Sequence, residues 1–282
     1  MKKKLPVQQM PGNTLVNVWQ LPYGKDSLSY RHHRHQFFML LWVTGGFGEH
    51  QVAFRNHPLL PGRVLFVQEG LAHRVLQQPE TGWLILFHPD IFHRFLRHHP
   101  ADEQHGLFDF LTPLPYIDLD PATAVTFAQI LPLLAAESAA YPQHTLAADL
   151  IGILLYAANR LHQPVHPALL HPGQAEQVRQ LKMLIERHYL IHRGAPFYAE
   201  KLGLSARKLN QLASKLTGSN VDELVEARII AEAESLLGVT AFTIKEIAFQ
   251  LNFISQSHFA YFFRRRKRIS PKAFRKLHQD KF

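Results

Sequence analysis

The chain has 282 residues and no cysteine, and its lysines and arginines exceed its acidic residues by nine. This length is more than one domain of ordinary size requires, so we expect two domains, each with its own hydrophobic core. The absence of cysteine excludes disulfide bonds, a thiolate nucleophile and a cysteine-ligated zinc site.

The positive charge is confined to the C-terminal part of the chain. Residues 175–282 contain 19 lysines and arginines against 10 acidic residues, whereas residues 1–174 contain 12 of each. This division is expected when one domain contacts a polyanion, although a solvated basic surface gives the same count. The apolar runs at residues 37–43 and 150–158 are too short to span a membrane, so we expect a soluble, cytoplasmic protein.

Short apolar segments broken by turn residues fill the region from residue 13 to residue 120. Five of them are predicted to be strands: 16–21, 37–43, 52–54, 64–67 and 83–87. The glycine-rich segment that follows residue 43 predicts a hairpin turn after the most apolar of these strands. Many short antiparallel strands are typical of a barrel or a jelly roll.

Three histidines lie close to the ends of these strands. His33 and His35 precede the strand at 37–43, and His73 follows the strand at 64–67. Alternate residues of a strand face the same side, so we expect His33 and His35 to point together into the mouth of the barrel. With His73 and Arg31 they are candidates for binding a small effector. A metal site and a solvated basic loop are the alternatives.

Two stretches, HRHQFFMLLWVTGGFGEHQVAF and LLPGRVLFVQEGLAH, resemble the cupin-type effector-binding domain of AraC/XylS-family regulators. The resemblance implies a cupin-like barrel that binds a small molecule. Metal-binding cupins usually carry a glutamate a few residues after the paired histidines. Phe38, Met39, Leu40 and Leu41 occupy that region here, so we expect neither a bound metal nor a cofactor.

Helical spacing of apolar residues predicts three helices after the barrel, at residues 89–98, 122–138 and 145–161. Pro132 is expected to kink or break the second helix. The apolar stripe of the third is either core or a seam between two copies of the chain, and the resemblance favours the seam.

A proline-rich segment separates the two halves of the chain. Residues 163–174 read QPVHPALLHPGQ, and three prolines with a glycine do not continue a helix. We therefore place the effector-binding and dimerisation domain at residues 1–162, a linker at 163–175 and the basic domain at 176–282.

Two segments of the basic domain share one pattern. When Ser205 and Ser255 are superposed, apolar residues recur four, seven and eight positions later in both segments. Gly203 and Asn252 suit the left-handed backbone on which a helix ends, and each serine suits the N-cap of the next helix. The pattern predicts two helix-turn-helix motifs, joined by a helix at residues 221–237.

The outward faces of the two predicted recognition helices are polar. We predict DNA contacts from Arg207, Lys208, Asn210, Gln211, Ser214 and Lys215 in the first and from Gln256, Ser257, His258, Ala260, Tyr261, Arg264 and Arg265 in the second. Arginine, asparagine and glutamine form paired hydrogen bonds with base edges, whereas lysine and capped helix ends hold phosphates. One polar helix face is ordinarily just solvated, but two matched faces in a basic domain favour DNA.

The stretches AEKLGLSARKLNQLASKLTG and ARIIAEAESLLGVTAFTIKEIAFQLNFISQSHFAYFFRRRKRISPKAFRK resemble the AraC/XylS DNA-binding domain. Two residues depart from the family pattern: Asn252 stands where the family mostly has glycine, and Tyr261 where it mostly has arginine. The first change is tolerable because asparagine adopts the left-handed conformation. The second removes a guanidinium group and is expected to change the base preference.

We therefore expect a multidomain α+β protein: a cupin-like β-barrel with following helices, then an all-α domain with two helix-turn-helix motifs. The expected function is sequence-specific DNA binding under the control of a small effector, without enzymatic activity. The expected partners are double-stranded promoter DNA with half-sites, the effector, a second copy of the chain and RNA polymerase, but no membrane. The resemblance alone favours activation over repression of transcription.

Two other interpretations stay open at this point. The barrel histidines of a metal-dependent cupin enzyme, fused to a DNA-binding module, would hold a metal, although the acidic ligand is missing. Alternatively, the barrel serves only to pair two subunits, in which case no metabolite would stabilise it against heat.

Overall fold

The computed structural model describes residues 7–12, 14–23, 30–98, 107–108, 114–142, 145–161 and 172–278. Contacts divide the chain into two compact units, of which the first spans Pro6–Gln163 and the second contains Pro164–Phe282. Residues 163–171 of the expected linker lie outside the described residues. A helix begins at Pro172, within the segment assigned to the linker.

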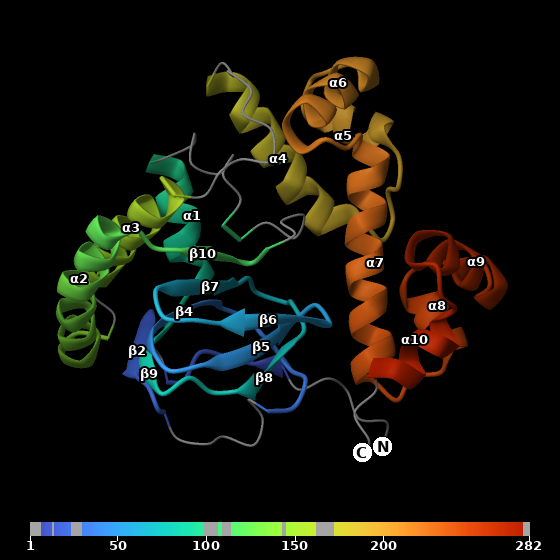
Figure 1. Ribbon diagram of the computed structural model, residues 1–282. Coiled ribbons are helices and arrows are strands. Elements are labelled where there is room, and N and C mark those ends of the chain that lie inside the picture. The colour runs from blue at the N-terminus through green and yellow to red at the C-terminus, as the bar shows by residue number, and fades with distance from the viewer. Residues whose placement is uncertain are drawn as a thin grey trace. The chain divides into compact units, whose positions relative to one another are not determined.

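Short strands and three helices make up most of the described part of the first unit (Figure 1). The strands are β1 Val7–Gln8, β2 Val16–Gln20, β3 Arg34–His35, β4 Phe38–Gly45, β5 Gly48–Val52, β6 Arg55–Leu59, β7 Arg63–Val67, β8 His73–Gln77, β9 Thr81–Phe87 and β10 Tyr116–Asp118. Antiparallel pairing gives a five-stranded sheet in the order β10-β7-β4-β9-β2 and a three-stranded sheet in the order β6-β5-β8. A short parallel pair joins β1 to β3. The described strands thus form separate sheets, arranged as in a jelly roll, and not one continuously bonded barrel.

Strand β4 lies at the centre of the five-stranded sheet and is apolar on both faces. Phe38, Leu40 and Trp42 join a core with residues of the helices α1 Pro89–His98, α2 Pro121–Ala140 and α3 Leu146–Asn159. Met39, Leu41 and Val43, on the other face, join a second core with residues of the three-stranded sheet. The sheet is therefore a middle layer, as its continuous apolar run requires.

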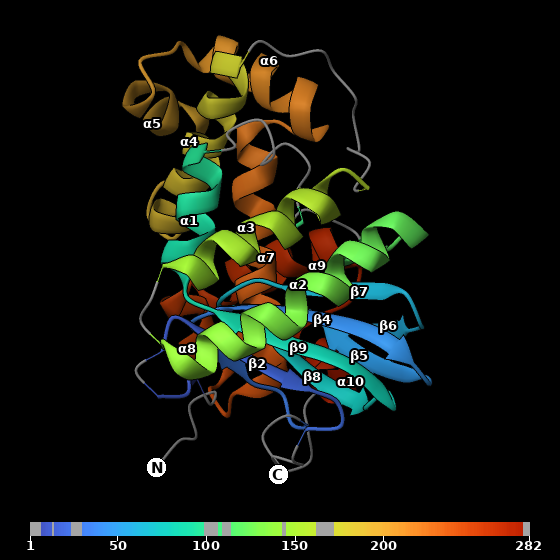
Figure 2. The ribbon, with the colours of Figure 1, turned by 90° about the vertical axis from the view of Figure 1, so that its left-hand side faces the viewer.

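The helices α2 and α3 lie side by side over the five-stranded sheet (Figure 2). Asp120 caps α2 by accepting a hydrogen bond from the backbone N–H of Thr123, and α2 continues through Pro132 without the break that the sequence suggested. Among the described helices, α2 alone has the length and apolar composition of a membrane-spanning helix. Phe127, Leu131 and Leu134 are buried in the core, and a single helix of this kind is weak evidence for a membrane.

Most of the predicted strands are found, but the one at residues 52–54 is wrong. Val52 ends β5, and Ala53 and Phe54 form a tight turn with φ angles of 47° and 61°. That turn leads into β6. Because β6 consists mainly of polar residues and a proline, the apolar pattern did not predict it.

The second unit is helical (Figure 1). Its helices are α4 Pro172–His188, α5 Ala195–Lys201, α6 Ala206–Thr217, α7 Val221–Val239, α8 Ile244–Gln250, α9 Gln256–Lys267 and α10 Pro271–His278. Helix α7 begins at a capping box in which Asn220 and Glu223 bond reciprocally. Its 19 residues make a rod of about 28 Å, with α6 packed against it on one side and α8 and α9 on the other.

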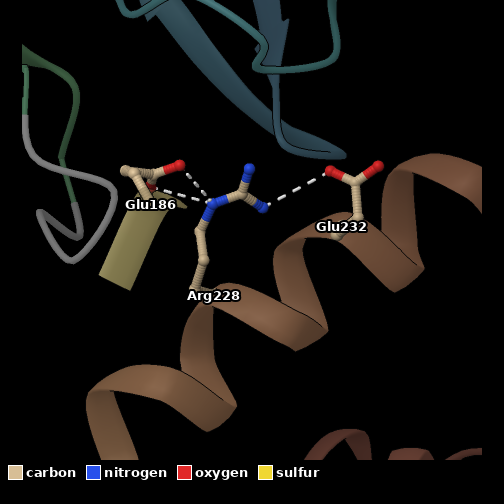
Figure 3. Close-up of polar contacts among 3 residues, drawn as sticks. All are labelled: Glu186, Arg228 and Glu232. Atoms are coloured by element: carbon tan, nitrogen blue, oxygen red, sulfur yellow. Dashed lines mark hydrogen bonds and ion pairs between the residues drawn. The ribbon is translucent and has the colours of Figure 1, made fainter. Parts of the chain in front are cut away.

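A half-buried ion-pair cluster joins α4 to α7 (Figure 3). The Arg228 Nε lies 2.8 Å from both carboxylate oxygens of Glu186, and its Nη1 lies 3.4 Å from Glu232. The guanidinium also covers the ring of Tyr189, 4.4 Å from its centroid. Arg228 thus ties α7 to α4, through a partner, Glu186, that spacing along α7 alone could not identify.

Candidate nucleic-acid interface and ligand cavity

Both predicted helix-turn-helix motifs are present, and their turns close with the same hydrogen bonds. In the first, the N–H of Leu204 donates to the carbonyl of Ala199 at 2.9 Å, and Gly203 has a φ of 64°. In the second, Phe253 donates to Ala248 at 2.9 Å, and Asn252 has a φ of 56°. This pairing is the Schellman motif, in which a left-handed residue ends the helix.

The predicted N-caps are also confirmed. The Ser205 hydroxyl accepts from the N–H of Lys208, and the Ser255 hydroxyl accepts from the N–H of His258. Each serine therefore fixes the first turn of a recognition helix, which is the turn that approaches base edges in such motifs.

The turn of the second motif is stabilised by long-range hydrogen bonds that the sequence did not reveal. Arg193, between α4 and α5, donates through Nη2 to the carbonyls of Leu251 and Asn252 at 2.6 and 3.0 Å. Its guanidinium also lies 4.1 Å from the centroid of the Phe253 ring. The Nδ2 of Asn252 donates to the carbonyl of Leu190 at 3.1 Å. The asparagine that departs from the family pattern thus adopts the left-handed conformation and makes a long-range bond that glycine cannot make.

The first recognition helix, α6, exposes most of the predicted contact residues: Arg207, Lys208, Gln211, Ser214 and Lys215. Asn210 is half-buried, and its Oδ1 accepts from the backbone N–H of Val221 at 3.0 Å. A bidentate contact to adenine uses both the oxygen and the nitrogen of an asparagine amide. Within α6, Arg207 and Gln211 are therefore better placed than Asn210 to read bases.

The second recognition helix, α9, has a more apolar outward face. Gln256, Ser257, His258, Tyr261, Arg264 and Arg265 are exposed, and Ala260 is half-buried. The Tyr261 side chain is 69% exposed, and Ile254 in the preceding turn is 88% exposed. Apolar and aromatic side chains contact the methyl group of thymine more readily than they contact the polar edge of guanine.

Acidic residues of α7 neutralise part of the basic run that ends α9. Glu226 pairs with Arg265 at 2.8 Å and with Arg266. Lys267 pairs with Glu234. The five consecutive basic residues of this run therefore do not all offer a free charge to phosphate.

In the first unit, predicted histidines converge on a cavity of about 240 Å³. The backbones of His33 and His73 form a β-bridge, and the centroids of their rings lie 4.2 Å apart. The ring centroids of His35 and His73 lie 4.7 Å apart. The prediction that His33 and His35 face the same side is confirmed. Arg31 is exposed, and it is not among the described residues that line this cavity.

A fourth histidine, His50 in β5, was missed by the sequence analysis. Its Nε2 lies 2.8 Å from Nδ1 of His73, and it also lines the cavity. His50 belongs to a strand that pairs with β8, so only the sheet register brings it beside His73. Alternation within the segment that follows Gly48 is the signal that places His50 on the inner face, but a hairpin prediction alone does not say which strand lies beside it.

His35, His50 and His73 are held in the neutral form. Burial is the main cause that lowers the pKa of His35 and of His50 to about 3, and the neighbouring His33 is the second cause. Burial, with His33 next, also holds the pKa of His73 well below its usual range. The described residues contain no group of three or more histidine or acidic side chains arranged to hold a metal ion.

Comparisons with known proteins agree with both units. Residues 23–155 match the AraC-like ligand binding domain, and residues 198–277 match a helix-turn-helix domain. YfiF of Bacillus subtilis strain 168, named an uncharacterized HTH-type transcriptional regulator, is 24% identical over 88% of this chain and 79% of its own length.

Two solved structures are also similar. ToxT of Vibrio cholerae matches 94% of this chain and 98% of its own with 10% identity and a TM-score of 0.45. The C-terminal domain of the response regulator AraT of Geobacillus stearothermophilus covers 37% of this chain and 88% of its own, with 24% identity and a TM-score of 0.36.

Proposed function

The chain belongs to the AraC/XylS family of transcriptional regulators, and from that premise we propose that it is a cytoplasmic homodimer that reads promoter half-sites with α6 and α9. Arg207 and Gln211 read bases in the first half-site. The residues Gln256, Ser257, His258, Ala260 and Tyr261 read the second, and Lys208, Ser214, Lys215 and Arg264 hold phosphates. Arg265, which pairs with Glu226, contributes less to phosphate binding than Arg264. Asn210 contributes chiefly by holding α6 against α7.

The observation that carries this proposal is the matched pair of motifs on one rod. Both recognition helices carry a serine cap at the same position after a Schellman turn, and both pack against α7. The major-groove faces of two half-sites on one side of B-DNA repeat every 34 Å or so. A rod of about 28 Å between the motifs is suited to place both helices on one side of the duplex.

In this proposal the ligand-binding domain regulates DNA binding in response to an effector. A small effector favours one arrangement of the two domains only by the difference in its affinity for each arrangement. The cavity that holds His33, His35, His50 and His73 is the effector site in this proposal. Family resemblance favours activation, through contact with RNA polymerase at the promoter.

Exposed apolar side chains on α2 and α3 support the second copy of the chain. Val125 and Leu133 on α2 are 56% and 58% exposed, and Ile153 and Tyr156 on α3 are 45% and 47% exposed. Contiguous apolar side chains on a surface commonly mark a protein interface. A change of Leu133 and Ile153 to aspartate is expected to convert the dimer to a monomer in analytical ultracentrifugation.

We infer no enzymatic role, because the barrel histidines lack an acidic companion at the position that metal-dependent cupins use. Turnover of a substrate by metal-loaded protein, lost in His73→Ala, would support the competing enzyme.

Selection of bound genomic fragments by the purified protein, followed by hydroxyl-radical footprinting, tests the proposal. We expect each subunit to protect two patches on one side of the duplex, about one helical turn apart. Protection of a single patch per subunit would show that only one motif reads DNA.

A further inference from the structure

The cavity of the first unit has one polar and one apolar wall. Four histidines, with Gln8 and Tyr23, contribute polar groups, whereas Trp19, Phe37, Met39, Val75, Leu84 and Leu86 contribute apolar surface. The rings of His35 and Phe37 stack at 4.2 Å where the two walls meet. A molecule that fills this space must therefore be amphipathic.

Buried ring nitrogens on the polar wall make no hydrogen bond with the described residues. They are Nδ1 and Nε2 of His35, Nδ1 of His50 and Nε2 of His73. Polar atoms buried in this way ordinarily bond to ordered water or to a ligand, and each one that does not costs about 1–3 kcal/mol. The polar wall is therefore incomplete without an occupant of the cavity.

The contact between His50 and His73 restricts what that occupant is. In the neutral pair, one ring donates through its proton and the other accepts, across the 2.8 Å between Nε2 of His50 and Nδ1 of His73. Each ring has a second, outer nitrogen that is not part of this contact: Nδ1 of His50 and Nε2 of His73. Whichever ring donates, its own outer nitrogen is an acceptor and the outer nitrogen of the other ring carries a proton. The pair thus always offers one donor and one acceptor, at its two opposite ends, and a hydroxyl group can satisfy either end because it both donates and accepts.

A carboxylate fits this wall poorly. It only accepts hydrogen bonds, so it can satisfy the donor nitrogen of the pair but not the acceptor nitrogen at the other end. The described residues that line the cavity include no lysine, arginine or acidic side chain. An anion buried there without a countercharge loses its hydration for no comparable gain.

The volume limits the size of the apolar part. An apolar cavity of about 150 Å³ takes up a single benzene ring. At about 240 Å³, this cavity accommodates one ring with a short polar substituent and excludes a large polycyclic molecule.

Resting on the effector role given to this cavity above, we propose that its ligand is an uncharged hydroxylated molecule with a ring-sized apolar body, and neither a carboxylate nor a metal ion. The hydroxyl group bonds one outer nitrogen of the His50–His73 pair, and the apolar body lies against Phe37, Leu84 and Leu86.

Calorimetric titration of the full chain with three matched probes, benzyl alcohol, benzoate and toluene, tests this proposal. At pH 7 we expect benzyl alcohol to bind at least tenfold more tightly than either of the others. Repeating the titration in two buffers of different ionisation enthalpy measures proton exchange. Benzyl alcohol is expected to bind without proton uptake, and any binding of benzoate is expected to take up about one proton and to strengthen as the pH falls.

The variants His73→Gln and His57→Gln give a matched pair. His57 is also a buried histidine of this domain, but it does not line the cavity. His73→Gln is expected to lose at least tenfold in affinity for benzyl alcohol but not for toluene, whereas His57→Gln keeps both. A thermal melt that matches the parent chain confirms that each variant is folded.

Several results would overturn the proposal: tighter binding of benzoate than of benzyl alcohol at pH 7 without proton uptake, stoichiometric zinc retained after dialysis, or no binding of any aromatic probe. These results concern ligand binding only. DNA binding is measured separately, by a mobility shift on a selected genomic site. A failed mobility shift with normal benzyl alcohol binding would instead contradict the regulator function.

Discussion

The side-chain oxygen of Asn210 accepts a hydrogen bond from the backbone N–H of Val221 at 3.0 Å. This bond satisfies one of the unpaired donors in the first turn of α7 and ties α6 to that turn. Asn210→Ala is therefore expected to lower the free energy of unfolding by about 1 kcal/mol, measured by urea denaturation. The exposed neighbour Gln211 is the control, since Gln211→Ala should leave stability unchanged. An equal effect of both variants would contradict the assigned role of Asn210.

Arg207 lies exposed in the first turn of α6, where base edges are read. Arg207→Ala should weaken binding to a selected site by about 1–3 kcal/mol and relax the preference at one base position. Competition binding against a library randomised at each position measures both effects. Lys208→Ala should instead weaken all sequences alike, and the same uniform loss in Arg207→Ala would assign Arg207 to phosphate.

The charges at the end of α9 should differ in their response to salt. Arg264 is exposed, whereas Arg266 pairs with Glu226. Arg264→Gln is expected to reduce the slope of log affinity against log salt by about 1, because one phosphate contact is lost. Arg266→Gln should change the slope much less. Binding measured at several salt concentrations distinguishes the two, and identical slopes would refute the neutralising role of Glu226.

Tyr261 should make α9 sensitive to thymine methyl groups. Replacement of thymine by uracil in the second half-site removes one methyl per base, so we expect a loss of about 0.8 kcal/mol, a factor of about four, at the contacted position. Tyr261→Phe should keep this dependence and Tyr261→Ala should abolish it, as measured by fluorescence anisotropy. A parent chain that binds both DNAs equally would exclude the methyl contact.

The neutral histidine cluster should make the first domain sensitive to acid. The pKa of His35 and of His50 is lowered to about 3, below the usual value near 6.5 that the unfolded chain has, so the unfolded chain binds more protons in between. The stability that these groups contribute is complete above pH 6.5 or so and is lost as the pH falls toward 3. The loss is at most about 1.4 kcal/mol per pH unit for each histidine.

Urea denaturation between pH 5 and pH 7 measures this slope. His35→Phe removes one titrating group and should flatten it, whereas His258→Gln, exposed on α9, should not change it. An unchanged slope in His35→Phe would place the origin of acid sensitivity elsewhere.

What the sequence could predict depended on how local the determining interactions are. The caps at Ser205 and Ser255 and the left-handed residues before them act within a few positions of their own helix, so the spacing revealed both helix-turn-helix motifs. The face shared by His33 and His35 follows from alternation in one strand. His50 joins them only through the pairing of β5 with β8, which no local pattern encodes.

The same distinction holds for the reading surface. That Arg207 is exposed follows from the apolar spacing of α6. That Asn210 bonds to Val221, and that Glu226 holds Arg265, depends on how α7 packs against both recognition helices. Helix periodicity identifies which side chains face outward, but not which of them are already engaged by a neighbouring helix.

The bonds from Arg193 and Asn252 give the second motif an attachment besides α7. They connect the turn between α8 and α9 to the segment that precedes α5, at Leu190 and Arg193. The second recognition helix is thus attached both to α7 and to this segment. The distance between α6 and α9 is therefore fixed unless both attachments break. When a promoter carries one base pair more or less between its half-sites, the DNA has to bend or change its twist to fit. Selection among promoters therefore extends to base pairs that no side chain touches.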